Sequence, residues 1–334
     1  MIFTHDKINY FRTFLDNSKT VMIIGHRAPD GDAIGSSCAM AHFLKSLGKE
    51  VQVWMPDSFP DFLLWIPGAD DIKIYEGNGK EGNRVMKESD LIFCMDFNRT
   101  DRTGPMSQVL GQVDTPRIVI DHHLEPANEF AVTFSETKVS STCELVYQLI
   151  ESLDLKHRVD LDTANCIYTG LVTDTGSFKY NVHPSTHRIA GELIGLGVNS
   201  AELQGNLFDT NTRDRLGLLG YAISEKLRHF PDHHASFMTL SKEELERFNY
   251  KKGDTEGLVN YGLSIEGVRF TALASEKDGV VKISFRSKGD TDVNVIANKN
   301  FGGGGHKNAA GARSEESLER VEEIIEEIIK GLPA

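Results

Sequence analysis

Three short apolar runs of this chain each end in aspartate or histidine side chains. The runs and the polar residues that follow them are 21–25 with His26, Asp30 and Asp32; 91–95 with Asp96; and 117–120 with Asp121, His122 and His123. Short apolar runs between turn residues are typical of buried parallel strands. Ligands of such sheets bind just outside the carboxyl ends of the strands. The sequence therefore predicts an α/β fold with a polar site at one edge of a parallel sheet.

The tripeptide Asp-His-His occurs twice in the chain. The second copy, Asp232–His234, precedes Ala235–Leu240, in which apolar and small polar residues alternate. That pattern predicts a surface turn that enters a half-exposed strand. We therefore expect the site at the first copy, because only that copy follows a buried strand and has two similar runs beside it.

The candidate metal ligands are aspartates and histidines at the ends of these runs and at a predicted helix end. They are His26, Asp30, Asp32, Asp96, Asp121, His122, His123 and Asp174. A single aspartate is commonly a helix cap and a single histidine is commonly a hydrogen-bonded core residue, but five carboxylates in one site repel one another unless cations are present. Mixed Asp and His ligands without thiolates favour manganese, with magnesium, cobalt, iron or zinc as alternatives. The number of ligands predicts two divalent ions, a usual arrangement for phosphate ester hydrolysis.

These segments resemble, in order, the four signature motifs of the DHH phosphoesterase superfamily. The motifs are His26–Ser36, Asp96, Asp121–His123 and Thr173–Gly176. The segments Arg286–Ser287, Asp292–Asn294 and Gly302–Gly311 resemble the associated substrate-binding domain, so the resemblance spans nearly the whole chain. Within the superfamily, the chain is most similar to bacterial bifunctional oligoribonucleases, or nano-RNases, that also dephosphorylate adenosine 3′,5′-bisphosphate (pAp).

The resemblance assigns a role to each matching residue. It implies one ion on His26, Asp30 and Asp96, and a second ion on Asp32, Asp96, His122 and Asp174, with Asp96 as the bridge. The catalytic residues would be Asp96, Asp121 and His123: Asp121 would orient His122, and His123 would face the scissile phosphate. The implied activities are exonucleolytic hydrolysis of oligonucleotides of two to five residues and removal of phosphate from pAp.

A glycine run near the C-terminus is the second candidate site. Four glycines, Gly302–Gly305, expose backbone N–H groups and admit a base or phosphate, although glycines alone are equally typical of a flexible turn. His306 follows them directly, and Arg286 lies on a nearby predicted strand. We predict that these residues bind substrate together with Arg102, which lies in the segment after Asp96.

The predicted organisation is a catalytic parallel-sheet domain and a smaller mixed α/β domain, with the active site in the cleft between them. The predicted ranges are 1–188 for the catalytic domain, 189–213 for a helical linker and 214–334 for the substrate-binding domain. The pattern also predicts a helix over 161–173 with Leu161 on its buried face. The last helix is predicted to begin at Ser314.

Composition limits the partners of the chain. The net charge is −13, which excludes a general basic surface for long duplex DNA and favours short RNA or DNA oligonucleotides and small nucleotides such as pAp. The four cysteines have no metal-binding spacing and predict buried free thiols in a reducing compartment. No signal peptide or membrane span is visible, so we expect a cytoplasmic protein that does not bind membranes. The sequence leaves open whether the chain is a monomer or a homodimer.

Two other functions remain open from the sequence. Within the same chemistry, the chain could be a phosphodiesterase for cyclic dinucleotides or their linear products. In a different class, it could be a nucleotide sensor that binds without hydrolysis. Turnover separates the sensor from the enzymes, and the complete ligand set favours an enzyme.

Overall fold

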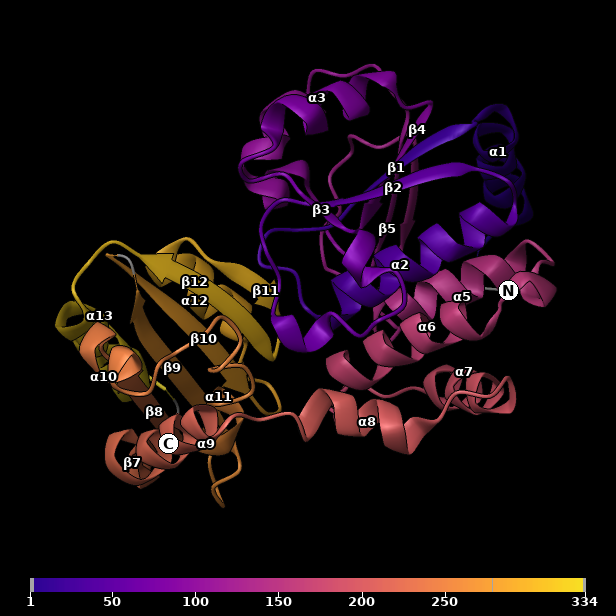
Figure 1. Ribbon diagram of the computed structural model, residues 1–334. Coiled ribbons are helices and arrows are strands. Elements are labelled where there is room, and N and C mark those ends of the chain that lie inside the picture. Colours follow the sequence, from indigo (N-terminus) through magenta and orange to yellow (C-terminus); the bar gives the residue numbers. More distant parts are fainter. Residues whose placement is uncertain (1–2, 278, 333–334) are drawn as a thin grey trace. The chain divides into compact units, whose positions relative to one another are not determined.

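The structure is a computed structural model that describes residues 3–277 and 279–332. Contacts within the chain divide it into two compact units, Met1–Thr210 and Asn211–Ala334 (Figure 1). This division lies inside the range predicted as a linker. Helices α7 (Pro184–Gly195) and α8 (Ser200–Phe208) belong to the first unit, where both pack on α6 (Leu161–Asp174).

The first unit contains a six-stranded sheet in the order β3-β2-β1-β4-β5-β6. All neighbouring strands in it are parallel, as the sequence predicts. The strands are β1 Thr20–Ile24, β2 Glu50–Met55, β3 Lys73–Ile74, β4 Leu91–Met95, β5 Arg117–Asp121 and β6 Val132–Ser135. The three strands that end in candidate ligands, β1, β4 and β5, are therefore direct neighbours.

Helices cover both faces of this sheet, which explains why its central strands are apolar at nearly every position. The other helices of the unit are α1 His5–Asn17, α2 Gly31–Ser46, α3 Gly79–Glu88, α4 Ser107–Leu110 and α5 Thr142–Ser152. Alternate residues of β1 point into different core clusters: Ile23 packs with α1, α2, α5 and α6, and Met22 packs with α3 and α4. Helices α2, α5 and α6 pack against one another (Figure 1).

The second unit contains a six-stranded mixed sheet in the order β11-β12-β10-β9-β8-β7. Its strands are β7 Arg228–Phe230, β8 Ala235–Leu240, β9 Phe270–Lys277, β10 Val280–Ser287, β11 Gly304–His306 and β12 Ala309–Ser314. Only β8 and β9 run parallel among these pairs, and the other neighbours are antiparallel. Its helices are α9 Arg213–Tyr221, α10 Lys242–Arg247, α11 Val259–Leu263, α12 Val293–Phe301 and α13 Leu318–Lys330.

The structure corrects three details of the predicted pattern. Leu161 is 48% exposed, because it occupies the first position of α6, before that helix enters the core. The last helix begins at Leu318 with Ser317 as its cap, because Ser314 instead ends β12 as part of the sheet. Strand β8 is buried along its whole length, because Phe237 and Met238 face different apolar cores on the two sides of the sheet.

Two further expectations concern the cysteines and membranes. All four cysteines are buried and unpaired, which confirms the prediction of free thiols. Within residues 3–277 and 279–332, no helix combines the length and the apolar character that crossing a membrane requires.

Candidate metal centre

The carboxyl ends of β1, β4 and β5 bring the predicted ligands of the first unit together. His26 follows β1, Asp96 follows β4, and His122 follows β5. The others come from helix ends: Asp30 caps α2, Asp32 lies in the first turn of α2, and Asp174 is the last residue of α6. Their side chains form overlapping clusters, in each of which the ligand atoms lie within 4.8 Å of one another.

His26, Asp30 and Asp96 form the first cluster. The Nδ1 of His26 lies 2.9 Å from the carbonyl oxygen of Arg27, to which it donates a hydrogen bond. That bond leaves the Nε2 directed at Asp96, with 3.4 Å between Nε2 and Oδ2. A backbone hydrogen bond of this kind fixes the ring and its tautomer in many metal-binding histidines.

Asp32, His122 and Asp174 form the second cluster. The Nε2 of His122 lies 3.3 Å from Oδ2 of Asp174 and 3.9 Å from Oδ2 of Asp32. It also lies 3.6 Å from Oδ1 of Asp96. Asp96 therefore presents one carboxylate oxygen to His26 and the other to His122, so that it lies between the two clusters.

The backbone of Asp96 is unusual as well. Its φ is +63°, in the left-handed region that few residues other than glycine adopt, although aspartate and asparagine do so more often than most. Such a conformation costs about 1–3 kcal/mol and persists where the surroundings fix it. The Thr142 hydroxyl donates to Oδ1 of Asp96 over 2.8 Å and holds the carboxylate in this position.

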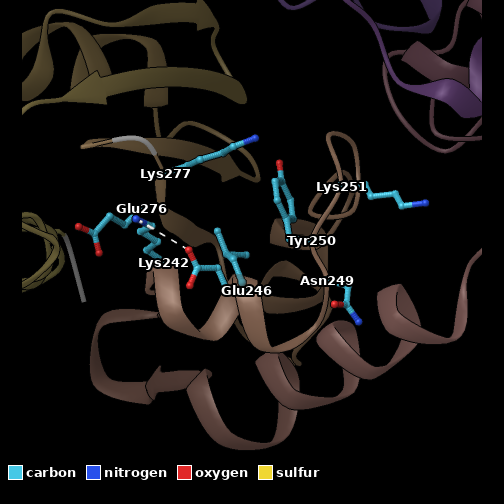
Figure 2. Close-up of a pocket in the computed structure, with 8 residues that line it drawn as sticks. Lys242, Glu246, Asn249, Tyr250, Lys251, Glu276 and Lys277 are labelled. Carbon is cyan, nitrogen blue, oxygen red and sulfur yellow. Dashed lines mark ion pairs between the residues drawn. The ribbon is translucent and has the colours of Figure 1, made fainter.

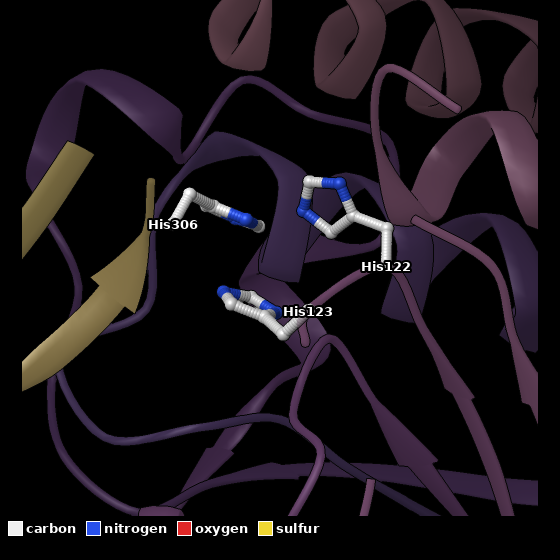
Figure 3. A group of neighbouring side chains, drawn as sticks. All are labelled: His122, His123 and His306. Carbon is white, nitrogen blue, oxygen red and sulfur yellow. The ribbon is translucent and has the colours of Figure 1, made fainter. Parts of the chain in front are cut away.

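Asp121 holds His123, whereas the sequence assigned it to His122. Its Oδ1 lies 2.7 Å from Nδ1 of His123, and its Oδ2 accepts from the backbone N–H of the same residue over 3.0 Å. The rings of His122 and His123 meet edge to face (Figure 3). Side chains two residues apart share a side of an extended segment, which explains the contact between Asp121 and His123, and orientation of His122 by Asp121 stays a prediction.

The electrostatics of the site show a surplus of carboxylate charge. Burial raises the pKa of Asp32 well above its usual range, and the charges of Asp96 and Asp30 add to this against two backbone hydrogen bonds. Burial by itself lowers the pKa of His26, but the hydrogen bond with Asp96 and the charges of Asp30 and Asp96 outweigh it and raise that pKa to about 9. Without a cation, protons thus neutralise part of the carboxylate charge.

The residues present fit divalent metal ions. Two atoms that share an ion at about 2.1 Å can lie at most about 4.2 Å apart. The distances of 3.3 to 3.9 Å around Nε2 of His122 satisfy this limit. Burial lowers the pKa of His122 and outweighs the charge of Asp96, which acts in the opposite direction, and this favours the neutral imidazole that binds a metal.

Sequence reasoning missed the residues that support Asp32. The backbone N–H groups of Thr142 and Cys143 donate to its carboxylate over 2.6 and 2.9 Å. Both belong to the first turn of α5, where N–H groups lack partners within the helix and the helix dipole favours negative charge. The pattern Ser141-Thr-Cys-Glu144 is the signal that could have indicated these donors, because it marks a helix N-terminus.

Gly170 of α6 offers a test of how tightly Asp32 is held. An added Cβ at Gly170 would lie 2.5 Å from Oδ1 of Asp32 and would also overlap the Cys143 side chain. We expect Gly170→Ala to lower the free energy of unfolding by about 1–3 kcal/mol, as overpacking does. We also expect a smaller rise of Tm on addition of Mn²⁺ than in the parent, because the carboxylate must move.

Gly191→Ala is the matched control, because Gly191 is also helical and an added Cβ would meet nothing within 4 Å. This variant should gain about 0.5–1 kcal/mol of stability. Denaturant unfolding and thermal melts with and without Mn²⁺ measure both effects. Equal free energies of unfolding and equal rises of Tm with Mn²⁺ in the two variants would show that the Asp32 carboxylate can move without a loss of stability or metal binding.

The second Asp-His-His copy forms a turn, as the sequence predicts. Pro231–His233 make one 3-10 turn, and His234 adopts a left-handed conformation with a φ of +50°. Its Nδ1 lies 2.9 Å from the carbonyl oxygen of Gly267. Among residues 3–277 and 279–332, none of these three side chains belongs to a group that could hold a metal ion.

The predicted substrate-binding residues lie in both units. In the first, the backbone of Arg102 accepts from the N–H of Arg27 over 2.9 Å, and its charge lowers the pKa of His26. In the second, Arg286 lies near the end of β10, and its guanidinium donates to the Phe285 carbonyl over 3.0 Å. His306 ends β11, whose pairing with β12 the sequence did not predict.

The fold requires glycine at some positions of the run Gly302–Gly305 and not at others. Gly302 ends α12 in a left-handed conformation with a φ of +62°. A Cβ on Gly303 would overlap the backbone of Gly311 and the side chain of Ala312. At Gly304, an added Cβ would meet only Oδ1 of Asn294, at an ordinary 3.4 Å. The fold therefore does not require glycine at position 304.

Comparison with known proteins identifies the family of the chain. The family description "DHH family, N-terminal domain" matches residues 20–171, and "DHHA1 domain" matches residues 235–332. The chain is 30% identical to the bifunctional oligoribonuclease and PAP phosphatase NrnA of Thermus thermophilus over 314 residues, which is 92% of this chain and 89% of that protein. It is 27% identical to the cyclic-di-AMP phosphodiesterase GdpP of Geobacillus thermodenitrificans, covering 95% of this chain and 48% of that protein.

A solved structure is similar over its whole length. It is an exopolyphosphatase-related protein from Bacteroides fragilis, 37% identical, with a TM-score of 0.93 and coverage of 98% of this chain and 96% of that one. The matched families, the NrnA relative and the aspartate and histidine clusters agree with one another. The chain therefore belongs to the DHH family of phosphoester hydrolases, with an N-terminal DHH domain and a C-terminal DHHA1 domain.

Proposed function

We propose that this protein is a two-metal-dependent phosphoesterase that hydrolyses oligonucleotides of two to five residues exonucleolytically and removes phosphate from pAp. The likeness to NrnA of Thermus thermophilus, whose name states both activities, supports this proposal. The observation that carries it is the position of Asp96, whose two carboxylate oxygens face His26 and His122 in different clusters.

The proposed metal ligands are the members of the two clusters. One ion, manganese by our proposal, would bind His26, Asp30 and Asp96, and the other would bind Asp32, Asp96, His122 and Asp174. When bound, the two ions would supply positive charge that activates water and neutralises the phosphoryl oxygens. The role of the chain is to fix these ligands, which the backbone donors of α5 and the Thr142 hydroxyl achieve for Asp32 and Asp96.

His123 is the proposed contact to the scissile phosphate. Its Nδ1 and backbone N–H are both occupied by Asp121, so the Asp121 carboxylate orients the ring. A protonated imidazole can donate through Nε2 to a phosphoryl oxygen and neutralise charge that develops there. Asp121 is thus a positioning residue in this proposal.

Substrate profiling tests the proposed function. Purified, manganese-loaded protein should release mononucleotides from RNA di- to pentanucleotides and inorganic phosphate from pAp, and it should leave long duplex DNA intact. Chromatography of the products also reveals from which end the oligonucleotides are shortened. Absence of turnover on both substrate classes would contradict the proposal and favour a nucleotide sensor.

A second candidate activity is hydrolysis of cyclic dinucleotides or their linear products. The observation that favours it is the likeness to GdpP, a cyclic-di-AMP phosphodiesterase. Cyclic di-AMP and linear pApA belong in the same assay. A kcat/KM for the cyclic compound above that for every linear oligonucleotide would replace the leading proposal by this one.

Arg286 should contribute binding energy that depends on the size of the substrate. We propose that it binds a terminal phosphate or base together with His306 and the glycine run. Loss of one charged contact of about 2–3 kcal/mol lowers kcat/KM on the order of 10²-fold, and we expect this for Arg286→Ala with di- to tetranucleotides. Hydrolysis of bis(p-nitrophenyl) phosphate, which lacks the distal groups, should hardly change.

The matched control for this prediction is Arg320→Ala, which removes an exposed arginine of the same unit that pairs with Glu323 at 2.7 Å. It should leave both substrates unaffected. Equal losses on the oligonucleotide and on the small phosphodiester in Arg286→Ala would place Arg286 in the fold or the metal site instead.

A further inference from the structure

One face of the second-unit sheet carries exposed or partly exposed residues along β10 and β12. Residues alternate between two sides of a strand, and Ile283 and Phe285 of β10 lie in the apolar core with Ala310 and Ala312 of β12. The intervening residues therefore share the opposite face of the sheet. They are Lys282, Ser284 and Arg286 on β10, and Ala309, Gly311 and Arg313 on β12.

The strand register arranges these residues in three rows across the sheet. Arg286 pairs with Ala309, which pairs with His306 of β11. Ser284 pairs with Gly311, which pairs with Gly304, and Lys282 pairs with Arg313. This face thus has basic groups in its first and third rows and small residues in the row between them. We call these three rows the basic strip.

The length of the basic strip matches a short nucleotide chain. Successive rows are two residues apart, so the first and third rows are separated by about 14 Å at a rise of about 3.4 Å per residue. A stacked single strand advances about 3.4 Å per nucleotide. A chain that begins at Arg286 therefore reaches Lys282 and Arg313 after about four nucleotides.

The far end of the basic strip carries two basic side chains, Lys282 and Arg313. No acidic side chain lies within salt-bridge distance of Lys282 or Arg313 in the part of the chain that the structure describes, residues 3–277 and 279–332. Like charges held together in a protein of net charge −13 are relieved by a bound polyanion.

The strip is also accessible. Apolar residues of β8 and β9, such as Met238 and Leu273, are covered on this side of the sheet by residues around α9, α10 and α11. In contrast, Lys282, Arg313, Gly304 and Gly311 are exposed. A ligand chain can therefore lie on the small residues of the middle row with its phosphates toward the basic ends.

We propose that the basic strip binds the phosphates of oligonucleotides beyond the first residues, so that substrates of about four or five nucleotides bind more tightly than dinucleotides. The proposal rests on the function proposed above and extends it to the preferred length of the substrate. The small residues of the middle row have a role in this proposal, because larger side chains there would hold the oligonucleotide away from Lys282 and Arg313.

A cavity elsewhere in the second unit contains lysines that serve as a control for the lysine and arginine of the basic strip. It measures about 470 Å³ and is lined by Lys242, Leu245, Glu246, Asn249, Tyr250, Lys251, Glu276 and Lys277 (Figure 2). The Nζ of Lys277 lies 5.1 Å from the centre of the Tyr250 ring. Three lysines and two glutamates line the cavity, and Lys242 pairs with Glu246 at 3.8 Å, so the glutamates offset most of the positive charge.

The test compares two double variants on substrates of different length. In manganese-loaded Lys282→Gln/Arg313→Gln, we expect kcat/KM for an RNA pentanucleotide to fall about tenfold, since exposed ionic contacts are individually weak. The values for a dinucleotide and for pAp should stay within about twofold of the parent. The slope of log KM against log salt concentration for the pentanucleotide should flatten by about 1.4, because two phosphate contacts are lost.

Lys251→Gln/Lys277→Gln, in the cavity, removes the same charge and should leave all three substrates unchanged. An equal fall of kcat/KM for the pentanucleotide in both double variants would show that the effect comes from net charge alone and would overturn the inference. Equal changes for all lengths, or no change for the pentanucleotide, would overturn it as well. A parent that hydrolyses none of these substrates would instead contradict the proposed function, so the two failures are distinguishable.

Discussion

Replacement of Asp96 by asparagine should reduce turnover at least about 10³-fold on every substrate. The variant keeps the shape of the side chain, the acceptor for the Thr142 hydroxyl and a residue type that tolerates the left-handed backbone at this position. It removes the charge that faces both His26 and His122. Loss of a supporting group outside the metal ligands typically costs 10–100-fold, so a ligand shared by two ions should cost more. Steady-state kinetics in excess Mn²⁺ measure this effect.

Circular dichroism and thermal unfolding of the same variant separate catalysis from folding. The fold should persist, because the substitution relieves repulsion among buried carboxylates. The rise of Tm that Mn²⁺ produces in the parent should be small or absent. Activity within tenfold of the parent would remove Asp96 from its proposed position between two ions.

The two Asp-His-His copies should respond in opposite ways to loss of a histidine. His122→Ala should abolish measurable turnover, because the ring lies within 4 Å of carboxylates from Asp32, Asp96 and Asp174. His233→Ala should retain activity within about twofold of the parent, because His233 belongs to a turn outside every metal-binding group of the described residues. Both variants remove the same atoms, so the comparison controls for the chemistry of the substitution.

Assays with both an oligonucleotide and pAp decide this contrast. A large loss in His233→Ala with its fold intact would assign a catalytic or binding role to the second copy. Full activity in His122→Ala would contradict the proposed ligand set of the second ion.

The sequence predicted the central strands because their signal is local. Runs such as Val21–Gly25 and Leu91–Met95 are apolar at nearly every position, as strands covered on both faces must be. In a parallel sheet the carboxyl ends of neighbouring strands lie at one edge. The aspartates and histidines that follow the runs were therefore expected to meet, and the structure brings them within 4.8 Å in overlapping clusters.

Other features depend on contacts that local patterns do not contain. The pairing of β11 with β12 depends on a glycine run that also fits a flexible loop. The burial of β8 on both faces depends on helices that pack on the two sides of the sheet, so its alternating pattern falsely indicated one exposed face. The donors to Asp32 come from α5, 110 residues away in the chain from Asp32 to Thr142. A single sequence gives no signal that these segments meet.

The most direct test of the proposed function is a titration of chelated protein with Mn²⁺ while hydrolysis of an RNA dinucleotide is followed. The proposed arrangement predicts no turnover in chelator and a rate that rises to its maximum at two equivalents of Mn²⁺ per chain. Full activity in chelator, or a maximum rate at one equivalent, would contradict a centre in which Asp96 serves two ions.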